Sequence, residues 1–592
     1  MKVLKGWTGK RLCVDLNVQK VWTEEIPRED LESFLGGRGL NAKFFSEKND
    51  LSGLSSSDRN PLVFGTGPLA GTFAPCSGWT SVSILSPYTD PPSYAQVSMP
   101  GHWGPQLKFA GFDQLIVQGK AESPIYLVID GSTVKFRDAR SLWRKDTSET
   151  MLKIYEGKEG RSVEVLCIGP AGERMIPFAN VTNRFSWTAD HIGLGAVFGS
   201  KNLKAITVRG NNPLLIDRPP LFLELSRTLR DRICRDPHGS DLREEGAFFF
   251  LGKNGGGLGI KNFNEVSSSD LEEKWKASYL KTFLCGREGC FSCPVHCGRV
   301  TRMGGDHFGG VHLEAAWSLG PRIGVNDWEW TLQLFRFCQR QGLDPCSAGS
   351  LLSWMMGSFD EKVLSEQDLG NMECRWGDGE AALRVLHWII REKGGGEGFR
   401  QGSLRAAKRL GKGLNQVAHC RGMDLPVRDP RSSMEYAVGL ALFPEEWDYL
   451  RSIGPGDHSV SSGSRADDRG TAEHVSNIED LKALADQTSL CPLVVARLPL
   501  MTPSDIADMM AAATGTDYRP ETLLQKAKKT LDLERKLLGL TRDGEKGVSA
   551  LPARFFERPL PDGSSLSKDF FEKEVSRFYQ ERGWPSPRGM EK

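Results

Sequence analysis

Short apolar runs separated by glycine and proline dominate the first 210 residues of the chain. These runs begin at Pro61, Thr80, Gln114, Ile125, Val163 and Lys204. Runs of this length between turn residues predict β-strands. Residues 28–48, after Pro27, carry instead the signals of a helix. The first 210 residues are therefore predicted to form a β-rich domain.

After residue 215 the apolar residues recur every three or four positions, which predicts amphipathic helices. The clearest segments are Leu221–Asp236, Val325–Gln341, Gly379–Glu392, Ile478–Gln487 and Thr522–Leu538. A proline-rich stretch at residues 211–220 separates the two patterns and reads as a linker. A β-rich part followed by a helical part predicts the α+β fold class.

Four of the 13 cysteines form a pattern suited to a cubane iron–sulfur cluster. Cys290, Cys293 and Cys297 form a C-x2-C-x3-C run, and Cys491 lies 194 residues further on. A compact triplet can surround one side of a cluster, and a distant cysteine completes the site when two parts of the chain dock. The spacing predicts a protein that transfers single electrons.

Zinc is the main alternative for these cysteines. Structural zinc prefers two paired arms of ligands, and this run supplies only one. Cys285, which is close by in sequence, is an alternative ligand of the cluster. The other cysteines have no pairing motif and are expected to be small core residues. They are Cys13, Cys76, Cys167, Cys234, Cys338, Cys346, Cys374 and Cys420.

Composition narrows the possible partners and compartment. The 592 residues have a net charge of +1, which gives no general case for binding nucleic acid or an anionic membrane. No apolar stretch is long enough to span a bilayer, so no membrane insertion is expected. No secretion signal precedes the many cysteines, which predicts a reducing, cytoplasmic location.

Glycine-rich segments follow one another along the whole chain. They begin at Leu35 (LGGRGLNA), Gly65 (GTGPLAGT), His102 (HWGPQLKFAGFD), Ile168 (IGPAGE) and Gly193 (GLGAVFGSKNLKAI). Further segments, not all of which contain glycine, follow in order at Gly342, Asp429, Asp486 and Leu551. Together with the cysteine triplet, this ordered set resembles the aldehyde ferredoxin oxidoreductase family. The resemblance extends over nearly the whole chain, and the chain is identified as a divergent member.

The resemblance implies an architecture and a set of cofactors. It implies a pterin-binding β-rich domain at residues 1–210 and helical domains at residues 211–420 and 421–592, which carry the triplet and Cys491 respectively. Family members hold tungsten or molybdenum between two pterins, with a bridging Mg²⁺ and an adjacent [4Fe–4S] cluster. They oxidise small aldehydes to carboxylates and pass the electrons to ferredoxin or a ferredoxin-like subunit.

The family supports each pterin with an Asp-x-x-Gly-Leu-(Cys/Asp) segment. The second copy here runs from Asp486 through Leu490 to Cys491, with Ser489 in place of glycine. The first copy runs from Gln339 to Asp344 and has an amide where the family has a carboxylate. The resemblance thus implies cofactor contacts for Asp486, Leu490, Gln339 and Asp344.

The β-rich domain departs from the family where it would bind the pterin phosphates. Trp79 stands where the family has arginine, and Ser98-Met-Pro-Gly101 replaces an amide-containing segment. An indole cannot replace the bidentate donors of a guanidinium. Ser98, Gly101 and Arg184 are the expected cofactor contacts, and His191 is a further candidate.

The resemblance implies that Glu314 is the catalytic base, because the family has a glutamate in this region. Its alternative is an exposed or a helix-start carboxylate. The family's second acid–base residue is a histidine that this chain lacks; Glu445, Glu446 and Asp448 are candidate replacements.

Two other functions of the protein stay open. One is an electron-transfer or structural subunit with an altered pterin site, and the other is a subunit of an aromatic acyl-CoA ring reductase.

Overall fold

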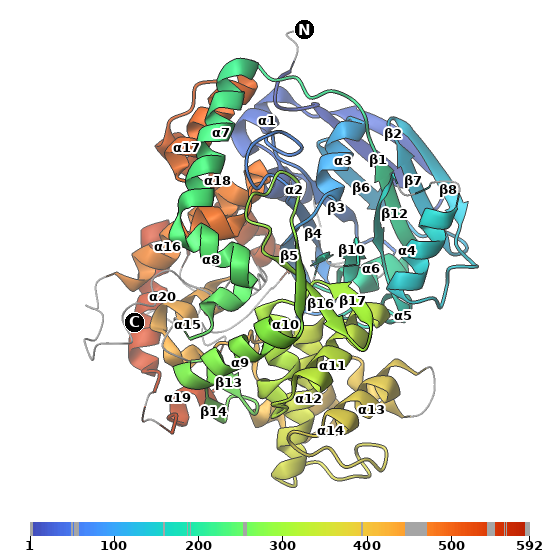
Figure 1. Cartoon of the computed structure of the whole chain (residues 1–592), viewed down its shortest axis with the longest axis vertical. Coiled ribbons are helices and arrows are strands. Elements are labelled where there is room, and N and C mark those ends of the chain that lie inside the picture. The colour runs from blue at the N-terminus through green and yellow to red at the C-terminus, as the bar shows by residue number, and fades with distance from the viewer. Residues whose placement is uncertain are drawn as a thin grey trace.

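The structure is a computed structural model of the chain (Figure 1). It describes residues 4–48, 51, 58–157, 160, 162–185, 187–189, 191–252, 257–391, 395–443, 470–541, 551–561, 563 and 565–585. The mixed sheets come first in the chain and the mostly helical regions follow, so the predicted α+β fold class is confirmed.

The first sheet has six strands in the order β2-β1-β6-β3-β4-β5. Their bounds are β1 (Lys10–Asp15), β2 (Lys20–Glu25), β3 (Leu62–Gly65), β4 (Thr80–Ser86), β5 (Ser93–Met99) and β6 (Gln114–Gln118). Strands β1 and β6 are parallel, and the other neighbours are antiparallel. β3 and β4 are buried along their whole length, as expected for the uninterrupted apolar runs that predicted them.

The second sheet also has six strands, in the order β11-β10-β9-β12-β7-β8. They are β7 (Ile125–Asp130), β8 (Thr133–Asp138), β9 (Glu164–Cys167), β10 (Val181–Asn183), β11 (Trp187–Ala189) and β12 (Leu203–Arg209). Helix α3 (Trp103–Ala110) joins this sheet to the first, because Trp103 packs on Phe64 of β3 and donates a hydrogen bond to the Ile206 carbonyl of β12. One apolar core includes residues of both sheets.

The helix predicted at residues 28–48 is two helices, α1 (Arg28–Phe34) and α2 (Gly37–Ser46). The chain turns between them at Leu35, which has a φ of 61°. Gly37 has a φ of 46°, and a Cβ at this position would lie 2.1 Å from the Asp486 carbonyl oxygen. The glycines of this segment therefore let α2 approach the end of a distant helix.

The first domain also contains α4 (Thr147–Glu156), α5 (Pro170–Glu173) and α6 (Leu194–Ser200). The main helices that follow it are α7 (Pro219–Arg235), α8 (Pro237–Glu245), α9 (Ser269–Thr282), α10 (Leu313–Leu319), α11 (Trp328–Gln341), α12 (Pro345–Asp360), α13 (Gly379–Ile390), α14 (Ser403–Leu410), α15 (Met434–Leu442), α16 (Thr471–Thr488), α17 (Pro503–Thr514), α18 (Pro520–Thr541), α19 (Arg554–Glu557) and α20 (Lys568–Arg582). Each of the five predicted helical segments overlaps one of them. The boundaries predicted at residues 210 and 420 stay predictions.

Helices far apart in sequence meet beside the first sheet. Figure 1 shows α16 and α18 (orange) next to α2 (blue), and both helices contact α2. Helices α10 to α14 lie together at the opposite end of the view. The C-terminal helices therefore bring Asp486 and Cys491 to the β-rich domain, although more than 270 residues separate them from its end at residue 210.

A small three-stranded sheet lies within the mostly helical part. It consists of β15 (Leu284–Glu288), β16 (Gly298–Met303) and β17 (Asp306–Gly309), all antiparallel. The loop between β15 and β16 contains the whole cysteine triplet. The hairpin fixes the two ends of this loop, so the three cysteines are held in a short, closed segment.

Candidate functional site

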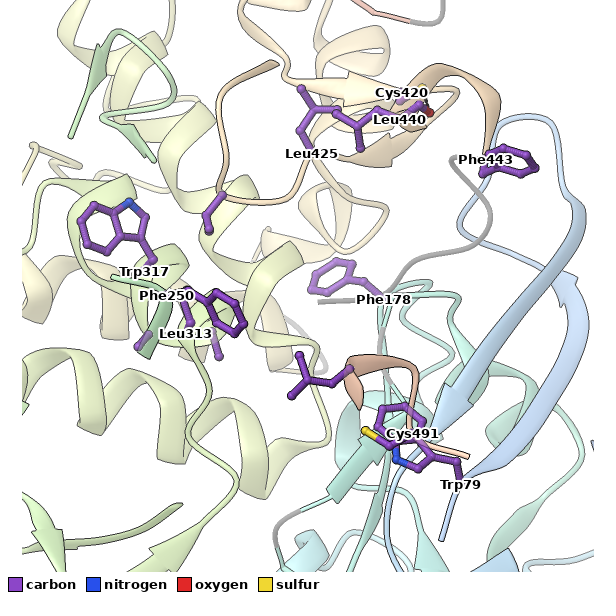
Figure 2. Close-up of a cluster of buried hydrophobic side chains, with 14 of the residues drawn as sticks. Trp79, Phe178, Phe250, Leu313, Trp317, Cys420, Leu425, Leu440, Phe443 and Cys491 are labelled. Atoms are coloured by element: carbon purple, nitrogen blue, oxygen red, sulfur yellow. Dashed lines mark hydrogen bonds between the residues drawn. The ribbon is translucent and has the colours of Figure 1, made fainter. Parts of the chain in front are cut away.

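Cysteine side chains from the triplet loop and from the C-terminal part of the chain lie together where the β-rich domain meets the helices. Cys290, Cys293 and Cys297 come from the β15–β16 loop, and Cys491 follows the C-terminal end of α16. Cys293 and Cys491 are buried, and the other two are partly buried. Figure 2 shows Cys491 beside Trp79, which enters from the β-rich domain.

Cys76 is a fifth cysteine at this place. It is buried in the core, as expected, and it also lies beside the cysteine triplet. Its sulfur lies 3.8 Å from the sulfur of Cys293, in hydrogen-bonding contact. Its backbone N–H donates to the Ser292 carbonyl, and its carbonyl accepts from the N–H of Cys491. No motif around Cys76 reveals this role, because the contacts form only when three distant segments fold together.

Cys285 differs from these five cysteines. It lies on β15, its side chain is exposed, and its thiol donates to the Val300 carbonyl at 3.4 Å. Among the described residues, its thiol has no hydrogen bond to another cysteine.

The cysteine set fits a [4Fe–4S] cluster. A cubane takes four cysteines, each at a separate corner. Cys293, Cys297 and Cys491 are all electrostatic neighbours of Cys290. Among the described residues, no three histidine, cysteine or acidic side chains are close enough together to bind a single metal ion. Burial raises the pKa of Cys297 to about 12, whereas the hydrogen bond from Cys76 lowers the pKa of Cys293 to about 7. A positive metal centre would favour the thiolate form of such buried sulfurs.

Asp486 is the centre of a buried charge network that joins the β-rich domain to the C-terminal helices. Its carboxylate accepts hydrogen bonds from Ser98 of β5 at 2.6 Å, from Arg38 of α2 at 3.2 Å and from Lys482 at 3.3 Å. Arg38 also forms a 2.6 Å ion pair with Glu534 of α18. Two positive and two negative side chains therefore neutralise one another in the interior.

The surroundings of Ser98 and Gly101 are suited to a pterin. Three buried oxygen atoms there have no hydrogen-bond partner among the described residues: Gln96 Oε1, Thr80 Oγ1 and Asn183 Oδ1. The Gln96 amide donates to Ser98, and a Cβ on Gly101 would lie 2.8 Å from Asn183 Oδ1. Buried acceptors without donors are costly, and the amino and ring N–H groups of a pterin are donors that could satisfy them. Leu490, also predicted to contact the cofactor, is fully buried.

The residues of the first motif copy are committed to protein partners. Gln339 donates to the carbonyls of Phe185 and Gly309, at 2.7 and 3.0 Å. Asp344 caps α12 and accepts hydrogen bonds from the Cys346 N–H, from Ser347 and from the ring of His191. The charge of His191 holds the pKa of Asp344 below its usual value despite burial. The structure thus brings His191 and Asp344 together and leaves Gln339 in a separate hydrogen-bonding position.

Arg184 lies at the edge of this region. It is partly exposed and forms an ion pair with Glu164 of β9. With Trp79 beside Cys491, the positions expected to bind pterin phosphates offer few unpaired cationic donors among the described residues.

Glu314 is fully buried, so it is not an exposed carboxylate. It does lie in the first turn of α10, so the alternative of a helix-start carboxylate stays open. One of its oxygens accepts the Val427 N–H at 2.9 Å. Arg322 is an electrostatic neighbour of Glu314, and its Nη1 donates to the Leu425 carbonyl at 2.7 Å. Both side chains therefore contact the segment that follows β19 (Met423–Asp424).

Arg322 presents unused donors in the interior. Its guanidinium is fully buried, yet Nε and Nη2 have no hydrogen-bond partner in the described part of the chain. Burial lowers its pKa, and the charges of Asp424 and Glu314 oppose that shift. Two adjacent free donors form the fork that binds a carboxylate in bidentate fashion. Glu445, Glu446 and Asp448, the candidate second acid–base residues, lie outside the described residues.

Residues 11–210 match the family profile described as the N-terminal domain of aldehyde ferredoxin oxidoreductase, and residues 224–592 match that of its domains 2 and 3. The chain belongs to the aldehyde ferredoxin oxidoreductase family. It is 31% identical to the tungsten-containing aldehyde ferredoxin oxidoreductase of Pyrococcus horikoshii, over 98% of this chain and 96% of that protein. Identity to the corresponding Pyrococcus furiosus enzyme is also 31%, over the same shares. The family resemblance found in the motifs is confirmed.

Two other proteins resemble this chain along nearly its whole length. The chain is 27% identical to the WOR-like subunit of the aliphatic sulfonate oxidoreductase of P. furiosus, over 98% of this chain and 95% of that one. The solved active-site complex BamBC of benzoyl coenzyme A reductase with 1,5-dienoyl-CoA superimposes with a TM-score of 0.86. It covers 98% of this chain and 95% of its own at 22% identity, which shows a shared fold.

No described helix combines the length and the apolar character needed to cross a membrane. The cytoplasmic location stays a prediction.

His312, the N-cap of α10, should make this family member sensitive to acid. Burial lowers its pKa from 6.5 to about 4, so between these values the unfolded chain binds the proton more tightly. Its contribution to stability is complete above about pH 6.5 and is lost as the pH falls towards 4, by roughly 2–3 kcal/mol. Denaturant midpoints at several pH values should show a smaller acid loss for His312→Asn. Parallel curves for the two proteins would contradict this assignment.

Proposed function

We propose that this chain is a tungsten- or molybdenum-pterin oxidoreductase that oxidises a small aldehyde to its carboxylate. The overall change is RCHO + H₂O → RCOO⁻ + 3H⁺ + 2e⁻, and the electrons leave through a [4Fe–4S] cluster to ferredoxin or a ferredoxin-like subunit. When bound, the metal–pterin group would accept the electron pair and the cluster would pass the electrons on singly.

The fully buried Glu314 beside Arg322 is the observation that carries this proposal. A water molecule that attacks an aldehyde carbon must lose a proton, and a buried carboxylate within reach can accept it. The product gains a carboxylate, whose two oxygens match the free Nε and Nη2 donors of Arg322. Base and anion binder thus lie at one site, which suits oxidation of a carbonyl to an acid.

The cofactor assignments rest on the family resemblance. Cys290, Cys293, Cys297 and Cys491 would hold the cluster. Asp486, Leu490, Ser98 and Gly101 would contact one pterin, for which the unsatisfied acceptors around Ser98 provide the support. Gln339 and Asp344 would face the second pterin, and Arg184 and a Mg²⁺ ion its phosphates. The tungsten-containing relatives favour tungsten as the metal.

Replacing Glu314 with glutamine should test the chemistry. The amide keeps the shape of the side chain and can still accept the Val427 N–H, but it cannot act as a base. Aldehyde-dependent reduction of a viologen dye, measured anaerobically, should fall about 10²- to 10⁴-fold at unchanged metal content. Glu272→Gln, at a buried carboxylate bonded to Ser267 on the β14–α9 connection, is the control and should stay near wild type. Full activity in Glu314→Gln would remove this residue from the mechanism.

A second function rests on the phosphate-binding positions. Trp79 replaces arginine, Arg184 pairs with Glu164, and His191 is bonded to Asp344. A chain that kept the cluster but bound no pterin would serve as an electron-transfer or structural subunit. Purified protein with iron but neither tungsten nor molybdenum would select this alternative.

A further inference from the structure

Cys76 lies in contact with both arms of the cysteine site. It occupies the loop between β3 and β4. Its N–H donates to the Ser292 carbonyl within the triplet loop, and its carbonyl accepts from the N–H of Cys491, each at 3.0 Å. Two residues on, a Cβ at Gly78 would lie 2.7 Å from Phe291 N and 3.1 Å from Cys290 Cβ.

The backbone of Cys76 adopts a conformation that suits glycine. Its φ is 62°, in the left-handed region that L side chains rarely adopt. Strain of this kind persists where the surroundings fix the residue, and it often marks a functional position. The backbone bonds to Ser292 and Cys491 supply that constraint, and the side chain that bears the cost is a fully buried thiol.

The number of sulfurs exceeds what a cubane takes. A [4Fe–4S] cluster has four cysteine ligands, on separate corners, and five thiols gather here. Ligands of different corners point away from one another, whereas the sulfurs of Cys76 and Cys293 are in contact at 3.8 Å. One of this pair is therefore a ligand and the other is not. Cys293 belongs to the C-x2-C-x3-C run, which leaves Cys76 outside the coordination sphere.

We propose that Cys76 is a non-ligand thiol that donates an S–H···S hydrogen bond to the Cys293 ligand and raises the reduction potential of the cluster. This inference rests on the cluster of the proposed function. Reduction adds a negative charge, part of which the ligand sulfurs carry, and hydrogen bonds to those sulfurs are among the factors that set cluster potentials. A donor at Cys293 stabilises the reduced form more than the oxidised form. Cys76 is thus a positioning and tuning residue that the β-rich domain contributes to the electron-transfer centre.

Three variants of Cys76 separate the thiol from the backbone. Cys76→Gly removes the donor and also relieves the left-handed strain, so it should fold at least as well as wild type. Cys76→Ala removes the donor and keeps the strain, and Cys76→Ser keeps a donor. Cys167→Ala is the control, because Cys167 is a buried thiol on β9 that donates to the Thr147 carbonyl.

The experiment measures iron per chain and the midpoint potential of the cluster by redox titration with electron paramagnetic resonance. All four variants should keep wild-type iron. In Cys76→Gly and Cys76→Ala the potential should fall, with about a tenfold change in the ratio of oxidised to reduced cluster at a fixed potential, equal to about 59 mV for one electron. Cys76→Ser and Cys167→Ala should stay near wild type.

Two results would overturn the inference alone. An unchanged midpoint in Cys76→Gly at full iron content would show that the thiol donates nothing to the cluster. Loss of iron in Cys76→Gly would show that Cys76 is itself a ligand. Absence of iron from the wild-type protein would instead overturn the cluster, and with it the proposed function.

Discussion

Arg38→Met is expected to lower the free energy of unfolding by about 3–5 kcal/mol, because it removes one partner of a buried ionic network. Arg38 is fully buried and contacts both Asp486 and Glu534. Without the charge of Arg38, Asp486 keeps its ion pair with Lys482, whereas the ion pair between Arg38 and Glu534 is lost. Methionine fills a similar volume, so the loss is electrostatic rather than a cavity effect. The denaturant midpoint, measured on protein of equal metal content, should shift accordingly.

Arg28→Met is the matched control for this effect. Arg28 begins α1 and forms an exposed ion pair with Glu32, one helical turn away. Exposed pairs of this kind contribute at most about 1 kcal/mol. Adding Glu534→Gln to Arg38→Met should recover part of the stability, because it removes a buried carboxylate that has lost its ion pair with Arg38. Equal shifts for Arg38→Met and Arg28→Met would mean that the buried network does not join the domains as described.

Cys491→Ser is expected to abolish the intact four-iron cluster. Cys491 is the only ligand proposed from the C-terminal part of the chain, and a hydroxyl is a far weaker iron ligand than a thiolate. Iron should fall well below the wild-type content of about four atoms per chain, and the visible absorbance and paramagnetic signal of the cluster should disappear. Cys285→Ser is the control, since the Cys285 thiol is exposed and bonds to the Val300 carbonyl. If Cys285→Ser lost iron and Cys491→Ser kept it, the ligand assignment would be wrong.

Local patterns predicted much of the fold because the relevant signals lie within short windows. The apolar runs at Pro61, Thr80 and Gln114 became β3, β4 and β6, and the three-to-four spacing of Thr522–Leu538 became part of α18. Strands such as β1 and β8 were missed because charged residues interrupt them and half-exposed strands carry a weak apolar signal. The break in the helix at Leu35 depends on contacts with a distant helix, which no local window contains.

The candidate site, like the fold, could be predicted only where the signal lies within a short stretch of sequence. The spacing of Cys290, Cys293 and Cys297 is a local signal, and it pointed to a cluster. Cys76 carries no such signal, since its partners Ser292, Cys293 and Cys491 lie at least 216 residues away in the chain. The pairing of Asp486 with Arg38 was likewise hidden, because it requires α16 to dock on α2. Motifs therefore identified the ligand types, and tertiary contacts decided which side chains meet.

The most direct test of the proposed oxidoreductase is elemental analysis of anaerobically purified protein for tungsten, molybdenum, iron and zinc. We expect about four iron atoms and about one tungsten or molybdenum atom per chain. The same iron content with neither heavy metal would contradict the oxidoreductase proposed here and leave an electron-transfer or structural subunit. Zinc in place of iron would contradict the cluster itself.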